Sequence, residues 1–395
     1  MTSRLHVAVV TETFPPEVNG VAMTIGRMVA GLQAAGHRVS LTRPRQRDEA
    51  SPAADGPSTL LVGGLPIPGY PGLRFGLPAR RLLRRHWMAD RPDVVQVVTE
   101  GPLGTSAVAA ARELRLPVVT EFHTNFHAYS RHYGFGWLER VVARHLRAMH
   151  NRGDLTLAPT REIADRLGQS GYRNVRIVAR GVDTTLFHPA RRHRELRSAW
   201  GAGDDDLVVA HVGRLAPEKN LPLVFQTFAA IRRHVPRARL LLVGDGPARR
   251  ALERRHPDAI FAGMRHGEDL AAHYASADLF LFPSLTETYG NVVLEALASG
   301  LPVVAYRQAA AAELIRHGVN GMLADPGARD QFERAALDLV VRPELRRRAS
   351  QEASASVSLL DWDRINDRLV AHLREAMARS ARLRRGESLF RFVPD

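Results

Sequence analysis

The chain has 395 residues, 45% of them apolar and 24% charged, which is typical of a folded chain of about two domains. It contains no cysteine, which excludes disulfides, thiolate catalysis, thiolate zinc sites and cysteine-ligated iron–sulfur clusters. The net charge of +14 indicates an anionic partner: nucleic acid, an anionic membrane surface or a phosphorylated small molecule. No apolar run approaches the ~20 residues of a spanning helix, and the first residues lack a signal-peptide layout, so we expect a cytoplasmic protein.

The first half of the chain alternates β-rich apolar runs with amphipathic helical patterns. Strands are expected at 4–10, 37–41, 93–98, 118–122, 155–158 and 175–179. Helices are expected at 23–35, 79–88, 103–114, 137–149 and 162–170. Such alternation is typical of a parallel sheet with helices on both faces.

Residues 189–206 interrupt this rhythm with a basic cluster and a polar, turn-rich stretch, and the second half then restarts it. Its expected strands are 207–212, 239–243, 259–262, 279–283 and 302–305, and its expected helices are 221–232, 248–255, 269–276, 292–299 and most of 324–385.

We therefore predict an α/β protein with two Rossmann-like, doubly wound domains that face each other across a cleft. The predicted parts are a domain at 1–188, a linker at 189–206, a domain at 207–378 whose last helices can pack back on the first, and a basic tail at 379–395. Ligands of such sheets bind outside the carboxyl ends of the strands.

The strongest local motif follows the strand at 279–283. Gly290 and Asn291 precede a helix that opens at Val292, and the N–H groups of such a helix end suit a phosphate. Two carboxylates flank this point, Glu287 in the loop and Glu295 in the helix, and carboxylates accept hydrogen bonds from sugar hydroxyls. One can serve a transferred sugar and the other a ribose. Alternatively, Glu295 balances the helix N-terminus and Glu287 is merely solvated.

A second motif, at 213–220, follows the strand at 207–212. Gly213 opens the loop, and Arg214 and Lys219, the one lysine of the chain, can clamp a diphosphate from two sides. In the first half, Asn19 and Gly20 precede the first helix, where Gly20 is either a second phosphate-approach site or a plain tight turn. His123 follows a strand end, which points it into the expected cleft.

These motifs together resemble the family 4 retaining glycosyltransferases, nucleotide-sugar enzymes of the GT-B fold, and in particular the bacterial enzymes that form glucosyl and mannosyl glycolipids. The resemblance covers nearly the whole chain and rests on segments 15–21, 181–189, 213–220, 243–247, 287–295 and 298–304, which occur in the family's order.

The resemblance implies a role for each of these residues. Arg214 and Lys219 would bind the donor diphosphate, together with Gly213, Gly20, Asn19 and the amides of Gly290, Asn291 and Val292. Glu295 would bind the ribose, Glu287 would hold the donor sugar, and His123 would bond the sugar near its reacting face. The acceptor hydroxyl would attack the sugar from the same face from which the leaving group departs. The departing phosphate would take the proton of the acceptor.

The predicted enzyme needs neither a metal nor a cofactor besides its UDP- or GDP-sugar donor. Asp204, Asp205 and Asp206 superficially match a metal motif of the other glycosyltransferase fold, but they are interpreted as a solvated acidic turn.

The expected acceptor is a membrane lipid, such as diacylglycerol or a phosphatidylinositol-type lipid, reached by peripheral binding to the inner face of the cell membrane. Two candidate helices, 79–88 and 137–152, combine arginines with Trp87 and Trp137, which suits anionic headgroups. Tyr129, Tyr133 and Phe135 add aromatic residues nearby. The alternative is that both helices simply pack on their own sheet.

Other functions remain open at this stage. One is a glycosyltransferase with a water-soluble or polysaccharide acceptor, and another is a phosphorylase or epimerase of the same fold. A nucleic-acid-binding protein is disfavoured because no recognition motif is present, so nucleic acid is not an expected partner. A nicotinamide oxidoreductase is disfavoured because no complete Gly-x-Gly-x-x-Gly occurs.

Overall fold

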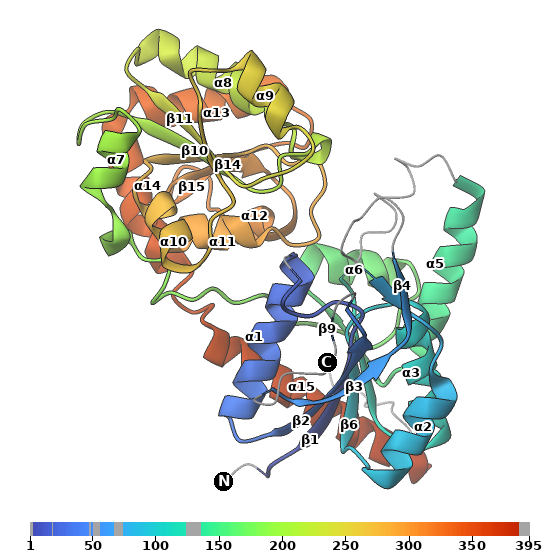
Figure 1. Cartoon of the computed structure of the whole chain (residues 1–395). Coiled ribbons are helices and arrows are strands. Elements are labelled where there is room, and N and C mark those ends of the chain that lie inside the picture. Colours follow the sequence, from blue (N-terminus) through green and yellow to red (C-terminus); the bar gives the residue numbers. More distant parts are fainter. Residues whose placement is uncertain are drawn as a thin grey trace, which may run out of the picture. The chain divides into compact units, whose positions relative to one another are not determined.

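The structure is a computed structural model that describes residues 3–17, 19–46, 49, 56–66, 74–123 and 136–386, with 136–139 described by their backbone. The chain divides into two compact units (Figure 1). Unit 1 holds the residues up to Arg180 and those from Trp362 onward, and unit 2 holds residues 181–361.

Unit 1 is built on a seven-stranded sheet with the order β3-β2-β1-β6-β7-β8-β9, in which every neighbouring pair is parallel. Helices α1 (Gly20–Ala34) and α15 (Trp362–Arg384) cover one face, and helices α2 (Arg80–Ala89), α3 (Pro102–Glu113) and α5 (Gly136–Asn151) cover the other (Figure 1). The strands are β1 (His6–Val10), β2 (Arg38–Pro44), β3 (Ser58–Val62), β6 (Val94–Val97), β7 (Val118–Glu121), β8 (Leu155–Ala158) and β9 (Val175–Ile177). Smaller elements are the antiparallel pair β4 (Gly64–Pro66) and β5 (Arg74–Gly76), and helix α6 (Arg161–Gln169).

Unit 2 repeats this design on a six-stranded parallel sheet with the order β12-β11-β10-β13-β14-β15. Its strands are β10 (Val208–Val212), β11 (Arg239–Val243), β12 (Ile260–Gly263), β13 (Leu279–Phe282), β14 (Val303–Tyr306) and β15 (Gly321–Ala324). Its helices include α8 (Leu221–His234), α9 (Arg249–Arg255), α10 (Gly267–Ala275), α11 (Asn291–Ala298), α12 (Ala309–Leu314), α13 (Arg329–Val341) and α14 (Pro343–Ser356).

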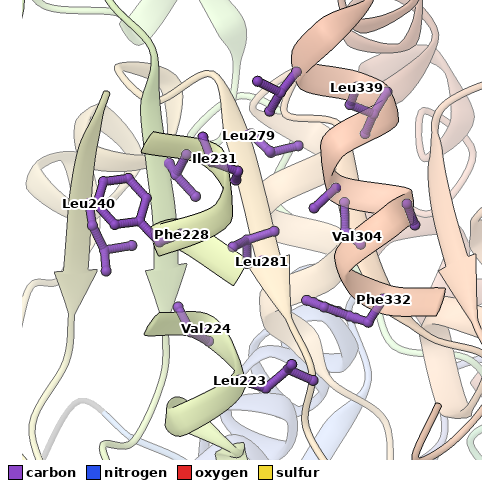
Figure 2. Close-up of a cluster of buried hydrophobic side chains, with 14 of the residues drawn as sticks. Leu223, Val224, Phe228, Ile231, Leu240, Leu279, Leu281, Val304, Phe332 and Leu339 are labelled. Atoms are coloured by element: carbon purple, nitrogen blue, oxygen red, sulfur yellow. The ribbon is translucent and has the colours of Figure 1, made fainter. Parts of the chain in front are cut away.

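The core of unit 2 lies between the sheet and helices α8 and α13 (Figure 2). Val224, Phe228 and Ile231 recur at i, i+4 and i+7, so α8 presents one apolar stripe to the strands. Leu240 and Leu281 meet this stripe from β11 and β13. Burying each such side chain stabilises the fold by about 1.5–3 kcal/mol, which fixes the strand ends that carry the site.

The boundaries of the two units correct the domain limits expected from the sequence. The division falls after Arg180 rather than after residue 188, and α15 belongs to unit 1, so the last helix does pack back on the first unit. Residues 189–206 are part of unit 2 rather than a linker, and they form η1 (Pro189–Arg191) and α7 (Arg194–Ala199). Arg197, 1% exposed, explains this, because its guanidinium donates to the carbonyls of Gly203 and Asp206 and so folds a polar stretch.

Each sheet reverses its strand order at one place, between β1 and β6 in unit 1 and between β10 and β13 in unit 2. Loops diverge at such a point, so it is where open α/β sheets bind ligands. In unit 2 the two loops that leave this point are 213–220, after β10, and 283–290, after β13.

Candidate functional site

The loop after β10 begins with a glycine in a conformation that other residues rarely adopt. Gly213 has a φ of 151°, and a Cβ atom on Gly244, in the loop after β11, would lie 2.1 Å from the Gly213 carbonyl oxygen. The two loops are therefore packed backbone against backbone, and Leu215 N–H donates to the Asp245 carbonyl at 2.9 Å. This packing leaves Arg214 exposed at the end of the central strand.

The loops at the switch point of unit 2 are joined by an ion pair. Lys219 Nζ donates to Glu287 Oε1, and the two side chains are 16% and 13% exposed. The Lys219 ammonium also lies 5.3 Å from the centroid of the Phe282 ring. A backbone bond of 2.9 Å from Leu285 N–H to the Glu218 carbonyl holds the loops together at the same place. The structure thus brings together two residues that the sequence places 68 positions apart.

Helix α11 starts directly beside this pair. Gly290 is its N-cap residue with a φ of 94°, and it carries no side chain that could cap the helix. The first backbone N–H groups of an α-helix point outward along its axis, and the helix dipole adds positive potential at this end. This end of α11 has the geometry expected of a phosphate subsite.

Glu295, one turn into α11, is half-buried and accepts a hydrogen bond of 2.9 Å from the Tyr274 hydroxyl. Tyr274 comes from α10, is 0% exposed, and packs against the rings of Phe187 and Phe280. Burial raises the pKa of Glu295 to about 7. Tyr274 lies in no motif, so nothing in the sequence singled it out as a partner of Glu295.

His211, inside β10, is a second residue that the sequence analysis missed. Its Nδ1 lies 2.9 Å from the Leu281 carbonyl oxygen, which makes Nδ1 the protonated nitrogen, and its ring stacks on Phe280 and Phe282. Burial lowers its pKa to about 4, so the ring is neutral beneath the Lys219 loop at physiological pH. The sequence did contain a signal for His211, because it is a polar residue within an otherwise apolar strand.

In unit 1 the expected donor contacts have other partners. Asn19 caps α1, because its Oδ1 accepts the N–H groups of Val21 and Ala22 at 3.1 and 2.8 Å, and its Nδ2 donates to Thr13 Oγ1. Gly20 is the first residue of α1 and is exposed. Helix capping by these contacts accounts for Asn19 and Gly20 at the start of α1. A role of either residue in binding the donor stays a prediction.

His123 lies just beyond β7, as expected, but it is only 7% exposed. Its Nε2 lies 2.6 Å from Glu121 Oε2, and its Nδ1 lies 3.4 Å from Nη2 of Arg180. Gln96 from β6 donates to the other oxygen of Glu121. Both ring nitrogens therefore face protein groups, so the expected bond to a sugar requires one of these contacts to yield.

The helix at 80–89 differs from a membrane anchor in one respect. Trp87, 1% exposed, packs with Leu83 in the core of unit 1, because these two positions form the apolar face of α2. The expected headgroup contact of Trp87 is therefore wrong. The helix does expose four arginines, at positions 80, 81, 84 and 85.

Helix α5 exposes a second set of arginines, Arg140, Arg144 and Arg147, with Val141 58% exposed among them. The expected aromatic residues Tyr129, Tyr133 and Phe135 lie outside the described residues, as do residues 387–395 of the predicted basic tail. The side chain of Trp137 also lies outside them.

The three consecutive aspartates of unit 2 are arranged as a structural turn. Asp204 pairs with Arg194, and Asp206 pairs with Arg237 and accepts the Gly203 N–H. Over the described part of the chain, no three His, Asp or Glu side chains are placed to hold a metal ion together.

The amino-acid sequence matches the family model described as Glycosyltransferase Family 4 over residues 18–186, and the model described as Glycosyl transferases group 1 over residues 206–341. It is 32% identical to a GDP-mannose-dependent alpha-mannosyltransferase of Corynebacterium glutamicum, over 96% of this chain and 91% of that protein. It is 30% identical to a GDP-mannose-dependent alpha-(1-6)-phosphatidylinositol dimannoside mannosyltransferase of Mycobacterium tuberculosis, over 96% of this chain and 98% of that protein.

Among solved structures, the fold resembles sucrose-phosphate synthase from Thermosynechococcus elongatus, with a TM-score of 0.76, 18% identity and coverage of 95% of this chain and 100% of that one. Two Rossmann-like units of this topology define the GT-B fold. The chain belongs to glycosyltransferase family 4. This membership sets aside the nucleic-acid-binding protein and the oxidoreductase.

Proposed function

We propose that this glycosyltransferase moves a mannosyl residue from GDP-mannose to a hydroxyl group of a membrane lipid, with retention of the α configuration. The assignment of GDP-mannose as the donor rests on one observation. Over more than nine-tenths of its length, the chain is similar to two enzymes named for their dependence on GDP-mannose. GDP-mannose holds its mannose in the α configuration, so an enzyme that makes α-mannosides from it retains that configuration.

The cluster in unit 2 supplies what such a donor needs. Arg214, Lys219 and the first amides of α11 provide positive charge for the diphosphate, with Glu287 for the sugar hydroxyls and Glu295 for the ribose. Negative charge grows on the diphosphate as the sugar departs, and fixed charges aimed at it lower the barrier by about 3–4 kcal/mol per group. We propose that these cations replace a divalent metal in this role.

The proton of the acceptor hydroxyl needs a destination on the same face of the sugar. In the proposed mechanism the departing phosphate oxygen takes it, which accounts for retention without an enzyme nucleophile. Glu287 then has the task of orienting the sugar rather than attacking it, which agrees with its ion pair to Lys219.

The proposed lipid acceptor is supported by the second relative, whose name includes phosphatidylinositol dimannoside, and by the exposed arginines of α5 and α2. Each basic residue near an anionic bilayer contributes about 1 kcal/mol of attraction. Every helix within the described residues is too short or too polar to cross a bilayer. We therefore propose peripheral binding at an anionic membrane face, with a water-soluble acceptor as the alternative.

The donor half of the proposal is tested by calorimetric titration of the protein with GDP and with UDP. We expect GDP to bind at least tenfold more tightly than UDP. Tighter binding of UDP would contradict the GDP-mannose assignment and would redirect it to a UDP-sugar, and binding of neither nucleotide would contradict the donor site itself.

A further inference from the structure

The ion pair between Lys219 and Glu287 links two subsites that the proposed function assigns to different parts of the donor. Lys219 is assigned to the diphosphate and Glu287 to the sugar, yet each side chain has the other as its charged partner. Building on that proposed function, we infer that Glu287 makes the enzyme discriminate against the sugar-free nucleoside diphosphate, which is its own product.

The Lys219–Glu287 ion pair is held in place from several sides. Any anionic group that binds the Lys219 ammonium therefore lies close to the Glu287 carboxylate as well. The bond from Leu285 N–H to the Glu218 carbonyl fixes the distance between the two loops. The Phe282 ring lies on one side of the ammonium, and both charged side chains are more than four-fifths buried. Partial burial strengthens charge–charge interactions relative to those at an exposed surface.

A nucleoside diphosphate that binds Lys219 brings its terminal phosphate close to the Glu287 carboxylate. That phosphate ends in a free monoester and carries about one more negative charge than the esterified phosphate of a sugar nucleotide. The product therefore meets repulsion from Glu287 and gains nothing from it. The donor differs because its sugar hydroxyls donate hydrogen bonds to the Glu287 carboxylate. The same carboxylate that repels the product therefore stabilises the bound donor.

This arrangement predicts opposite effects of one substitution on two ligands. In Glu287→Gln the carboxylate charge is removed at nearly constant size, which frees the Lys219 ammonium for the diphosphate. We expect GDP to bind about tenfold more tightly than to the wild type, and GDP-mannose to bind more weakly because an acceptor for its hydroxyls is poorer. Calorimetry at pH 8 with both ligands measures this, and the melting temperature confirms that the variant is folded.

Three further variants test whether the charge of Glu287, acting together with Lys219, is what weakens GDP binding. Glu287→Asp keeps the charge and should keep GDP affinity within about twofold of the wild type. Glu295→Gln, in the proposed ribose subsite, should weaken GDP and GDP-mannose alike, because both contain the ribose. In a Lys219→Met background, Glu287→Gln should tighten GDP binding by less than it does when Lys219 is present, because the part of the gain that comes from freeing the ammonium is lost.

The inference is overturned if Glu287→Gln binds GDP no more tightly than the wild type, or if the gain persists unchanged without Lys219. Its failure is distinguishable from failure of the proposed function. Wild-type protein that binds GDP and GDP-mannose, combined with an unchanged Glu287→Gln variant, contradicts only the discrimination. Wild-type protein that binds neither contradicts both. If UDP is the preferred nucleotide, UDP and UDP-glucose take the same places in the comparison.

Discussion

Donor binding should depend on pH through Glu295, and Tyr274→Phe should displace that dependence. Burial raises the pKa of Glu295 to about 7, so the carboxyl ionises as the pH rises through neutrality. The ionised form accepts the ribose hydroxyls better than the protonated form does. With a pKa near 7, the ionised fraction rises from about one-tenth at pH 6 to about nine-tenths at pH 8, so donor affinity should rise about tenfold over this range.

The hydroxyl of Tyr274 donates to Glu295 at 2.9 Å and so favours the ionised carboxylate. Its removal in Tyr274→Phe should raise the pKa of Glu295 further. A hydrogen bond to a charged group is worth about 1.5–3 kcal/mol, which corresponds to roughly one to two pH units. A displacement of one unit lowers the ionised fraction at pH 7 from about one-half to one-tenth, so binding there should weaken about fivefold.

The assay is calorimetric titration with GDP-mannose between pH 6 and 9. This ligand is preferable to GDP, because the terminal phosphate of GDP itself ionises near pH 6. Binding is measured rather than turnover, because burial also raises the pKa of Glu12, in unit 1, to about 7. A pH profile of turnover could therefore contain the titration of Glu12 as well as that of Glu295. His211 does not interfere, since its pKa is about 4.

Two variants serve as controls for this prediction. Glu295→Gln should abolish the pH dependence, and Tyr172→Phe, which removes a tyrosine hydroxyl from unit 1, should leave the curve unchanged. Affinity that is flat from pH 6 to 8 in the wild type, or a Tyr274→Phe curve that superimposes on it, would refute the reasoning.

Lys219→Ala should lower kcat/KM by about 100- to 1000-fold with little change in melting temperature, because Lys219 lies in the loop after β10 and outside the hydrophobic core cluster of unit 2; wild-type turnover would contradict the diphosphate assignment. Transfer should continue in excess EDTA, and loss of activity that magnesium or manganese restores would show that the cationic side chains do not suffice. The protein should sediment with vesicles containing phosphatidylglycerol but not with pure phosphatidylcholine, less so as salt increases. Changing the three α5 arginines to Glu should weaken this binding, as should the same change in α2, and full binding by both variants would exclude these helices as the anchor.

Much of the fold was predictable because its signals are local. The strand at 155–158 and that at 239–243 were placed with the bounds that the structure gives, and most other elements agree within a few residues. These strands are short apolar runs bounded by turn residues, a pattern that needs no knowledge of distant contacts. The strand at 321–324 and the first short strands after residue 56 were missed, because periodicity alone does not distinguish so short a run from a segment of helix or loop.

The site was predictable only as a list of residues. Strand ends placed Lys219 and Glu287 at one edge of the sheet, but their pairing depends on how two loops pack, which no local pattern records. The same holds for Tyr274 beneath Glu295 and for Glu121 and Arg180 around His123, since all of these contacts join separate elements. Trp87 shows the converse error, because an amphipathic pattern does not reveal whether the apolar face meets a membrane or the core of its own unit.

The central claim is transfer of mannose from GDP-mannose to a lipid hydroxyl with retention. Its most direct test is incubation of the protein with GDP-mannose and phosphatidylglycerol vesicles containing diacylglycerol or phosphatidylinositol, with Lys219→Ala as the control. Mass spectrometry of the extracted lipid detects the added hexose, and nuclear magnetic resonance of the anomeric carbon gives its configuration. The account predicts an α-mannosyl lipid that the variant does not form. A β-linked product, or release of free mannose without any mannosylated lipid, would contradict it.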